Sequence, residues 1–179
     1  LTWEKMENVL APKVWGAWNL HQLTEHYELD FFALYSSAAS LLGSLGQGSH
    51  VAANSFLDAL AHYRQAQGLP AVSINWGPWA EVGSAATEQV QRQMELQGIG
   101  AIAPQQGIQA LSQILSQPEL TQIGVIPINW ARFQQQNIVN DPFFSSLAKT
   151  ASSLEPQQQN IPSADWIAEL STLPQRRRA

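Results

Sequence analysis

Three polar residues lie where the surrounding pattern favours apolar ones, and their side chains could hold or transfer protons. Lys13 lies on or beside the apolar stripe of an expected helix. His50 and Asn54 are four residues apart, so on a helix they share one face, which also carries Leu57 and Ala61. An ammonium, an imidazole and an amide brought together in this way suggest an acid–base site.

Two hydroxyls extend this set. Ser36 and Ser37 end an apolar run that is typical of a strand, and open α/β sheets bind ligands at the carboxyl ends of their strands. Each residue also has a structural explanation. A lysine beside an apolar stripe usually reaches water, a core histidine or asparagine is usually hydrogen-bonded internally, and strand-end serines often form turns. The joint occurrence of all five favours a site.

The elements that position these residues follow from periodicity. Residues 2–28 are expected to form a helix that Pro12 could split into a short lead-in and a longer segment. Residues 30–36 read as a strand buried on both faces, and residues 38–48 as a loop with one short helical turn. The first helix should bury an apolar stripe at Met6, Val9, Leu10, Val14, Ala17 and Leu20.

The same alternation continues along the chain. Residues 49–67 are expected to form a helix, 71–76 a strand, 87–97 a polar lid helix, 104–116 a helix and 123–128 a strand. The helix over 104–116 should bury Ile108, Leu111 and Leu115. This order predicts an α/β fold with a doubly wound parallel sheet. Beyond Arg132 the chain is rich in Gln, Ser and Pro, which is typical of a linker, and Ser163 could cap a last helix.

Composition narrows the function classes. A net charge of -5 gives no electrostatic reason to expect nucleic acid or an anionic membrane as a partner. The absence of cysteine excludes disulfides, thiolate metal sites and cysteine nucleophiles, and is compatible with a cytoplasmic protein. Asp58 and His62 could form an ion pair or a metal site, but without a third ligand we expect no metal. The first residue, Leu1, suggests the interior of a longer chain.

Five sequence motifs carry a family resemblance. In chain order, the motifs LAPKVWGAWNLH (residues 10–21), FALYSS (32–37), GQGSHVAANSFLD (46–58), SINWGPW (73–79) and IPINW (126–130) resemble motifs of the ketoreductase domains of modular polyketide synthases. The resemblance implies the Rossmann-like short-chain dehydrogenase/reductase fold, of which this chain would hold only the carboxyl-terminal half. It places residues 1–145 in the catalytic domain and residues 146–179 in a linker that leads to a carrier domain.

The resemblance also implies roles for single residues. Lys13 matches the catalytic lysine, Ser37 the serine that binds the substrate carbonyl, and Asn54 the asparagine that orders the proton relay. His50 occupies the position of the catalytic tyrosine. The match further implies a substrate contact at Trp79 and cofactor contacts at Asn75, Trp76 and Gly77.

The implied reaction is the NADPH-dependent reduction of a β-ketoacyl thioester carried by an acyl carrier domain. The main cofactor loop would lie upstream, because no G-x-G-x-x-G motif follows any expected strand of this chain. The other half of the reductase and the carrier domain are therefore the expected partners. The alternative is a structural or epimerising domain that has lost reduction because of His50.

The two alternatives differ in whether the His50 imidazole can donate a proton to the substrate oxygen. An imidazole has an ordinary pKa of ~6.5, and a nearby lysine should lower the pKa of His50 further. A neutral imidazole still has one N–H for the carbonyl, but it protonates an alkoxide poorly. Histidine is also shorter than tyrosine, and a displacement of ~1 Å can cost ~100-fold in rate.

Overall fold

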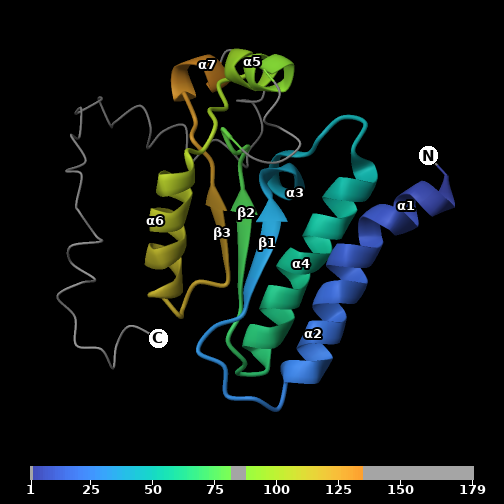
Figure 1. Cartoon of the computed structure of the whole chain (residues 1–179). Helices are drawn as coiled ribbons and strands as arrows, with labels where there is room; N and C mark the ends of the chain where they lie inside the picture. Colours follow the sequence, from blue (N-terminus) through green and yellow to red (C-terminus); the bar gives the residue numbers. More distant parts are fainter. Residues whose placement is uncertain (1, 82–87, 135–179) are drawn as a thin grey trace. The chain divides into compact units, whose positions relative to one another are not determined.

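A three-stranded parallel sheet forms the centre of the structure (Figure 1), a computed structural model that describes residues 2–81 and 88–134. The strands β1 (Ala33–Ser37), β2 (Val72–Trp76) and β3 (Gln122–Val125) pair in the order β1-β2-β3. All described residues belong to one unit of the chain, residues 1–138. The predicted α/β class with a parallel sheet is confirmed. The predicted linker and last helix lie outside the described residues.

Strand β2 is buried along its whole length because helices cover both faces of the sheet. Val72, Ile74 and Trp76 belong to the apolar cluster on the face that α6 (Pro104–Leu115) covers. Ser73 and Asn75 point the other way, toward α4 (Gly48–Ala66), as the two-residue period of a strand requires. The second face therefore contains polar groups that must find partners inside the protein.

The first helical segment, which Pro12 could have split into two, does not break there. It continues from α1 (Trp3–Leu10) through a π-helical turn, η1 (Ala11–Trp15), into α2 (Gly16–Thr24). The N–H of Gly16 bonds to the carbonyl of Ala11, five residues earlier. Because proline has no N–H and its ring crowds the preceding turn, a wider turn accommodates Pro12 without ending the helix.

The prediction of burial is wrong for two residues. Leu20 and Ile108 are each 55% exposed, whereas His21 and Ile114 are buried. The π turn inserts one residue into the helix, so the buried face after it is shifted and includes His21 in place of Leu20. In α6 the buried face runs through Gly107 and Ile114, because the ring of Trp79 lies against Gly107.

Two of the connecting helices match the predictions, and one was not predicted. The expected helical turn after β1 is α3 (Ala38–Leu42), and the expected lid helix is α5 (Glu88–Leu96). A short helix, α7 (Trp130–Gln134), follows β3, where the sequence analysis expected no helix. Its signal is Asn129, whose side-chain oxygen accepts a hydrogen bond from the Arg132 N–H at 3.1 Å, as a helix N-cap does.

A buried arginine joins the helical layer to the sheet at the end opposite the carboxyl ends of the strands. The Arg64 guanidinium donates to His21 Nδ1 at 3.0 Å and to the Pro70 carbonyl at 3.2 Å, and lies 3.9 Å from the centre of the Phe32 ring. Burial lowers the pKa of Arg64, and the carboxylate of Glu25 opposes that effect. The sequence analysis did not find this cluster, because no motif distinguishes the buried Arg64 from an arginine on the exposed face of a helix.

We expect Arg64→Ala to lower the free energy of unfolding by about 2–3 kcal/mol, the usual cost of losing hydrogen bonds from a buried charged group. Arg132→Ala, at an exposed position, is the control and should change it by less than about 0.5 kcal/mol. Urea denaturation followed by circular dichroism measures both variants. Equal costs for the two substitutions would show that the Arg64 cluster does not stabilise the fold.

Candidate functional site

The residues with possible acid–base roles come together at the carboxyl end of β1. Lys13 lies on η1, Ser37 ends β1, and His50 and Asn54 lie on the first turns of α4. The Lys13 ammonium donates to the backbone carbonyl of Tyr35 at 2.8 Å, two residues before Ser37. The helix, the strand and α4 therefore contribute to one region of the structure, as the sequence analysis predicts.

The π turn places Lys13. Single π turns inside α-helices occur frequently at functional sites, because the extra residue changes the direction of the side chains that follow. Burial lowers the pKa of Lys13, and the negative charge of Asp58 raises it in opposition. Lys13 is thus an ammonium that is partly removed from water and bound to the end of a strand.

The two serines at the end of β1 have different surroundings. Ser37 Oγ accepts a hydrogen bond from the Ala39 N–H at 3.2 Å and caps α3. Its hydroxyl proton can still be donated to a ligand, because a hydroxyl both accepts and donates. Ser36 is buried, and its hydroxyl donates to the Asn54 carbonyl at 3.2 Å. Ser37 is therefore the serine that can reach a substrate, whereas Ser36 belongs to the interior.

Asn54 is fully buried, and its two amide atoms differ in their partners. The Nδ2 group donates to the His50 carbonyl one turn earlier, at 2.7 Å. The Oδ1 atom is buried and accepts no hydrogen bond from the described residues. Because buried polar atoms are nearly always hydrogen-bonded, this oxygen is suited to accept one from a group that enters the site.

The His50 imidazole is half-buried on the same face of α4 as Asn54. Burial lowers the pKa of His50, and the nearby Lys13 ammonium lowers it further. The direction expected from the sequence is confirmed, but burial is the larger cause, and the sequence could not reveal it. At neutral pH the ring is therefore uncharged, with one N–H to donate and one nitrogen to accept.

The residues expected to contact cofactor and substrate lie at the carboxyl end of β2. The Trp76 ring lies between those of Tyr35 and Trp79, with centroids 5.6 Å and 5.1 Å away. The Gly77 N–H bonds to the Val125 carbonyl at 2.9 Å. A Cβ on Gly107 would lie 2.2 Å from the Trp79 ring, so only glycine at position 107 permits this ring position.

Asn75 differs from the other expected cofactor residues because its side chain is fully buried. Its amide nitrogen lies 2.9 Å and 3.0 Å from the two oxygens of Asp58, and its amide oxygen accepts from Gln122 at 3.2 Å. Both ends of the amide are thus used inside the protein. A cofactor contact from Asn75 stays a prediction, and its side-chain partners indicate a supporting role.

The described residues can form only part of a dinucleotide site. A Cβ on Gly77 would lie 3.3 Å from the Val125 carbonyl oxygen, so this glycine permits close packing against the end of β3, and Trp76 Nε1 is a buried donor without a partner among the described residues. However, no glycine-rich phosphate-binding motif is present in the sequence.

Asp58 is a residue whose partners the sequence analysis missed. We considered it only with His62, but the two side chains point to different neighbours. His62 is exposed and its Nε2 lies 3.1 Å from Gln122 Oε1, whereas the Asp58 carboxylate faces Ser73 and Asn75 in the sheet. Across residues 2–81 and 88–134, no three potential ligands are grouped as a metal ion requires. The spacing from Asn54 to Asp58, one helical turn, was the available signal.

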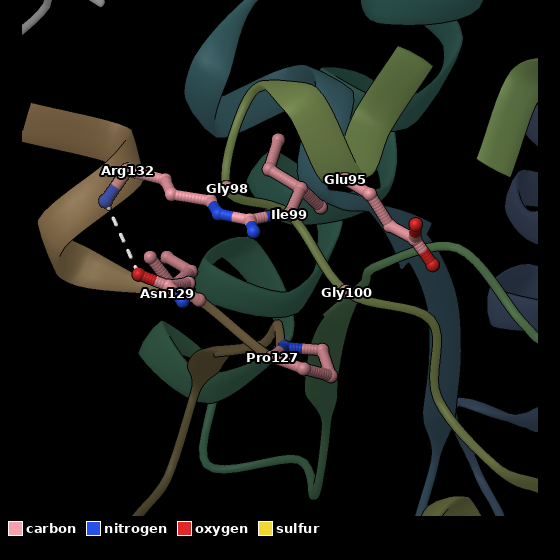
Figure 2. Close-up of a pocket in the computed structure, with 8 residues that line it drawn as sticks. Glu95, Gly98, Ile99, Gly100, Pro127, Asn129 and Arg132 are labelled. Atoms are coloured by element: carbon pink, nitrogen blue, oxygen red, sulfur yellow. Dashed lines mark hydrogen bonds between the residues drawn. The ribbon is translucent and has the colours of Figure 1, made fainter. Parts of the chain in front are cut away.

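A hollow of about 530 Å³ is lined by residues of α5, of α7 and of the segments beside them. It lies apart from the residues with possible acid–base roles. Figure 2 shows Glu95 and Arg132 beside it, with Gly98, Pro127 and Asn129 along its wall. Gly98 has φ +80°, and a Cβ there would lie 2.7 Å from the Phe133 nitrogen. This glycine therefore permits close packing against α7. The hollow includes neither Lys13 nor His50.

Comparison with known proteins identifies the family. The family model described as "KR domain" matches residues 1–81. The phthioceranic/hydroxyphthioceranic acid synthase of Mycobacterium tuberculosis (strain ATCC 25618 / H37Rv) is 38% identical over 97% of this chain and 8% of its own length. Polyketide synthase GfsE of Streptomyces halstedii is 48% identical over 65% of this chain and 3% of its own length. The chain is thus a small part of the length of these synthases.

Solved structures agree with this comparison. A structure of A-type ketoreductases from a modular polyketide synthase has a TM-score of 0.79 and 35% identity, over 86% of this chain and 33% of that one. The first ketoreductase of the tylosin polyketide synthase has a TM-score of 0.66 and 37% identity, over 75% of this chain and 30% of that one. Within the described part of the chain, no helix is long and apolar enough to cross a membrane. Sequence and fold together show that the chain belongs to the ketoreductases of polyketide synthases.

Proposed function

We propose that this chain supplies the acid–base residues for reduction of a β-ketoacyl thioester that is carried by an acyl carrier domain. The observation that supports the proposal most directly is the convergence of Lys13, Ser37, His50 and Asn54 at the carboxyl end of β1. NADPH, when bound, supplies the hydride that attacks the β-carbon of the ketone. The residues of this chain then bind the carbonyl oxygen and deliver one proton to it.

The four residues divide this work. The Ser37 hydroxyl donates a hydrogen bond to the carbonyl oxygen and stabilises the charge that develops there. The His50 N–H donates to the same oxygen, and its proton moves to the alkoxide as the C–O double bond becomes a single bond. The second ring nitrogen can accept a replacement proton from the relay that Lys13 supplies. The free Oδ1 of Asn54 orders that relay.

The electrostatics of the site favour a neutral imidazole in this role. Burial and the Lys13 ammonium both hold the pKa of His50 below its ordinary value, so the proton is stored on the lysine and not on the ring. A neutral imidazole can donate at one nitrogen while it accepts at the other. A neutral imidazole alone is a poor proton donor to an alkoxide, but a ring that gains a proton from Lys13 at one nitrogen as it gives its proton at the other becomes neither an imidazolate nor a stable cation.

The second candidate function is a structural or epimerising domain without reduction. The observation that favours it is the shorter side chain of His50, because a displacement of ~1 Å can cost ~100-fold in rate. Against it, Lys13, Ser37 and Asn54 keep positions and partners that suit reduction. We also propose that the parent protein acts in the cytoplasm, together with a carrier domain and the other half of the reductase, as the absence of cysteine permits.

We predict that the 179-residue chain alone shows no saturable binding of NADPH, because its sequence contains no glycine-rich phosphate-binding motif. Fluorescence titration of the reduced nicotinamide measures this, with the intact reductase domain as the positive control. A micromolar dissociation constant for the chain alone would contradict the proposed division of the cofactor site.

We expect His50 to be required for reduction in the intact domain. With a β-ketoacyl thioester, oxidation of NADPH should fall by about 100-fold or more in His50→Phe, which keeps a flat ring but has no N–H to donate. His50→Tyr should retain activity, because the hydroxyl is also a donor. Lys13→Ala gives the background rate, since it removes the proton source.

Stopped-flow absorbance at the nicotinamide band follows all four proteins. If the unmodified domain and His50→Phe share the Lys13→Ala background while His50→Tyr turns over, His50 does not support reduction. The structural or epimerising alternative would then replace the proposed function.

A further inference from the structure

The carboxylate of Asp58 lies buried beneath the proposed site and is surrounded by hydrogen-bond donors. Ser73 Oγ donates to Oδ1 at 2.6 Å, and Ser40 Oγ donates to Oδ2 at 2.7 Å. Asn75 Nδ2 lies 2.9 Å and 3.0 Å from the two carboxylate oxygens. Only 8% of Asp58 is exposed, so these contacts replace water almost completely.

The donors select a carboxylate at this position. An ionised carboxylate accepts hydrogen bonds at both oxygens and donates none, which matches two hydroxyls and an amide N–H₂ group. An asparagine at position 58 would direct an N–H₂ group at one of these donors and lose the corresponding bond. In residues 2–81 and 88–134, no lysine, arginine or histidine forms an ion pair with Asp58. The negative charge is therefore held by neutral donors alone.

The same donors connect Asp58 to the serine that we propose binds the substrate. Asn75 Nδ2 lies 3.1 Å from Ser36 Oγ and 3.4 Å from the Ser37 carbonyl. Ser40 Oγ lies 2.9 Å from the same Ser37 carbonyl. The Ser40 hydroxyl has a single proton, which it gives either to Asp58 or to this carbonyl, so the carboxylate acts on the turn between β1 and α3 through the Asn75 amide. A shift of this turn would move the Ser37 hydroxyl.

Asp58 also acts on Lys13. Burial lowers the pKa of Lys13, and Asp58 provides the opposing negative charge that raises it. Among the described residues, the other titratable group that interacts with Lys13 is His50, which also lies on α4. The proposed mechanism needs a protonated Lys13 and a neutral His50. A buried anion near the lysine favours this pair of protonation states.

We propose that Asp58 is a positioning residue of the reductase site: through the Asn75 amide it fixes the Ser36–Ser37 turn. Its negative charge also acts on Lys13, in the direction that opposes the effect of burial. The inference rests on the proposed function for its kinetic consequences, whereas its effects on the turn and on Lys13 are independent of turnover. The simpler alternative is that Asp58 only fastens α4 to β2 through Ser73. The two explanations differ in what happens to Lys13 when the charge is removed.

The test compares Asp58→Asn with Ser73→Ala in the intact reductase domain. Asp58→Asn keeps the shape but removes the charge and reverses one hydrogen bond. We expect kcat to fall by ~100-fold with little change in KM, because the misplaced turn affects the reaction more than binding. The alkaline limb of the pH–kcat profile should move to lower pH, since Lys13 loses its proton more easily. Ser73→Ala removes one bond and no charge, so it should lower the melting temperature without moving that limb.

A second readout does not depend on activity. The NMR signal of the Lys13 side chain, assigned with Lys13→Arg, reports its titration in the same proteins. This signal should titrate at lower pH in Asp58→Asn than in the unmodified domain. In Ser73→Ala it should titrate at the same pH as in the unmodified domain. If the unmodified domain shows no turnover, the proposed function fails and this titration alone decides the role of Asp58.

The double variant Asp58→Asn, Asn75→Asp moves the carboxylate from position 58 to its hydrogen-bond partner at position 75. It tests whether a negative charge at the neighbouring position restores what Asp58→Asn removes. We expect it to recover part of the Lys13 titration shift and, in an active domain, part of kcat. An unchanged Lys13 titration in Asp58→Asn, or an equal shift in Ser73→Ala, would overturn the proposal. Wild-type kcat and an unmoved alkaline limb in Asp58→Asn, in a domain that turns over, would do the same.

Discussion

Strand β2 is buried on both faces, and its Ser73 and Asn75 side chains must find partners without water. The Asp58 carboxylate supplies them, at 2.6 Å from Ser73 and 2.9 Å from Asn75. A buried amide or hydroxyl left without a hydrogen-bond partner would cost about 1–3 kcal/mol, so this contact fixes how α4 lies on the sheet. Because His50 and Asn54 occupy the turns of α4 before Asp58, the same contact also fixes where they meet β1.

In the proposed site, some side chains are held by hydrogen bonds inside the protein, whereas others keep a donor or an acceptor available to a ligand. Lys13, on the π turn that contains Pro12, donates to the Tyr35 carbonyl, and Ser36 donates to the Asn54 carbonyl. Above them, the Ser37 hydroxyl proton and the Asn54 oxygen remain available to a ligand. Preorganised donors of this kind need little rearrangement when charge develops on a substrate oxygen. In the proposed function, the His50 N–H is the proton donor among these groups.

Much of the fold could be predicted from periodicity and motif order, because buried strands and amphipathic helices leave clear patterns. The three parallel strands and the helix that carries His50 and Asn54 are confirmed. The errors arise where one residue alters the phase of a helix: the π turn at Pro12 exposes Leu20 and buries His21. The partners of Asp58 and Arg64 come from distant segments; the spacing along α4 places Asp58 on the face of Asn54, but it does not identify the residues of the sheet that contact it.

The most direct measurement for the whole account is a crystal structure of the intact reductase domain with NADPH and an unreactive β-ketoacyl analogue. We predict that the Ser37 hydroxyl and one His50 nitrogen both lie within hydrogen-bond distance, ~3 Å, of the ketone oxygen. The contacts of Asp58 with Ser40, Ser73 and Asn75 should be unchanged. A His50 ring turned away from the ketone, with no donor in its place, would contradict the account.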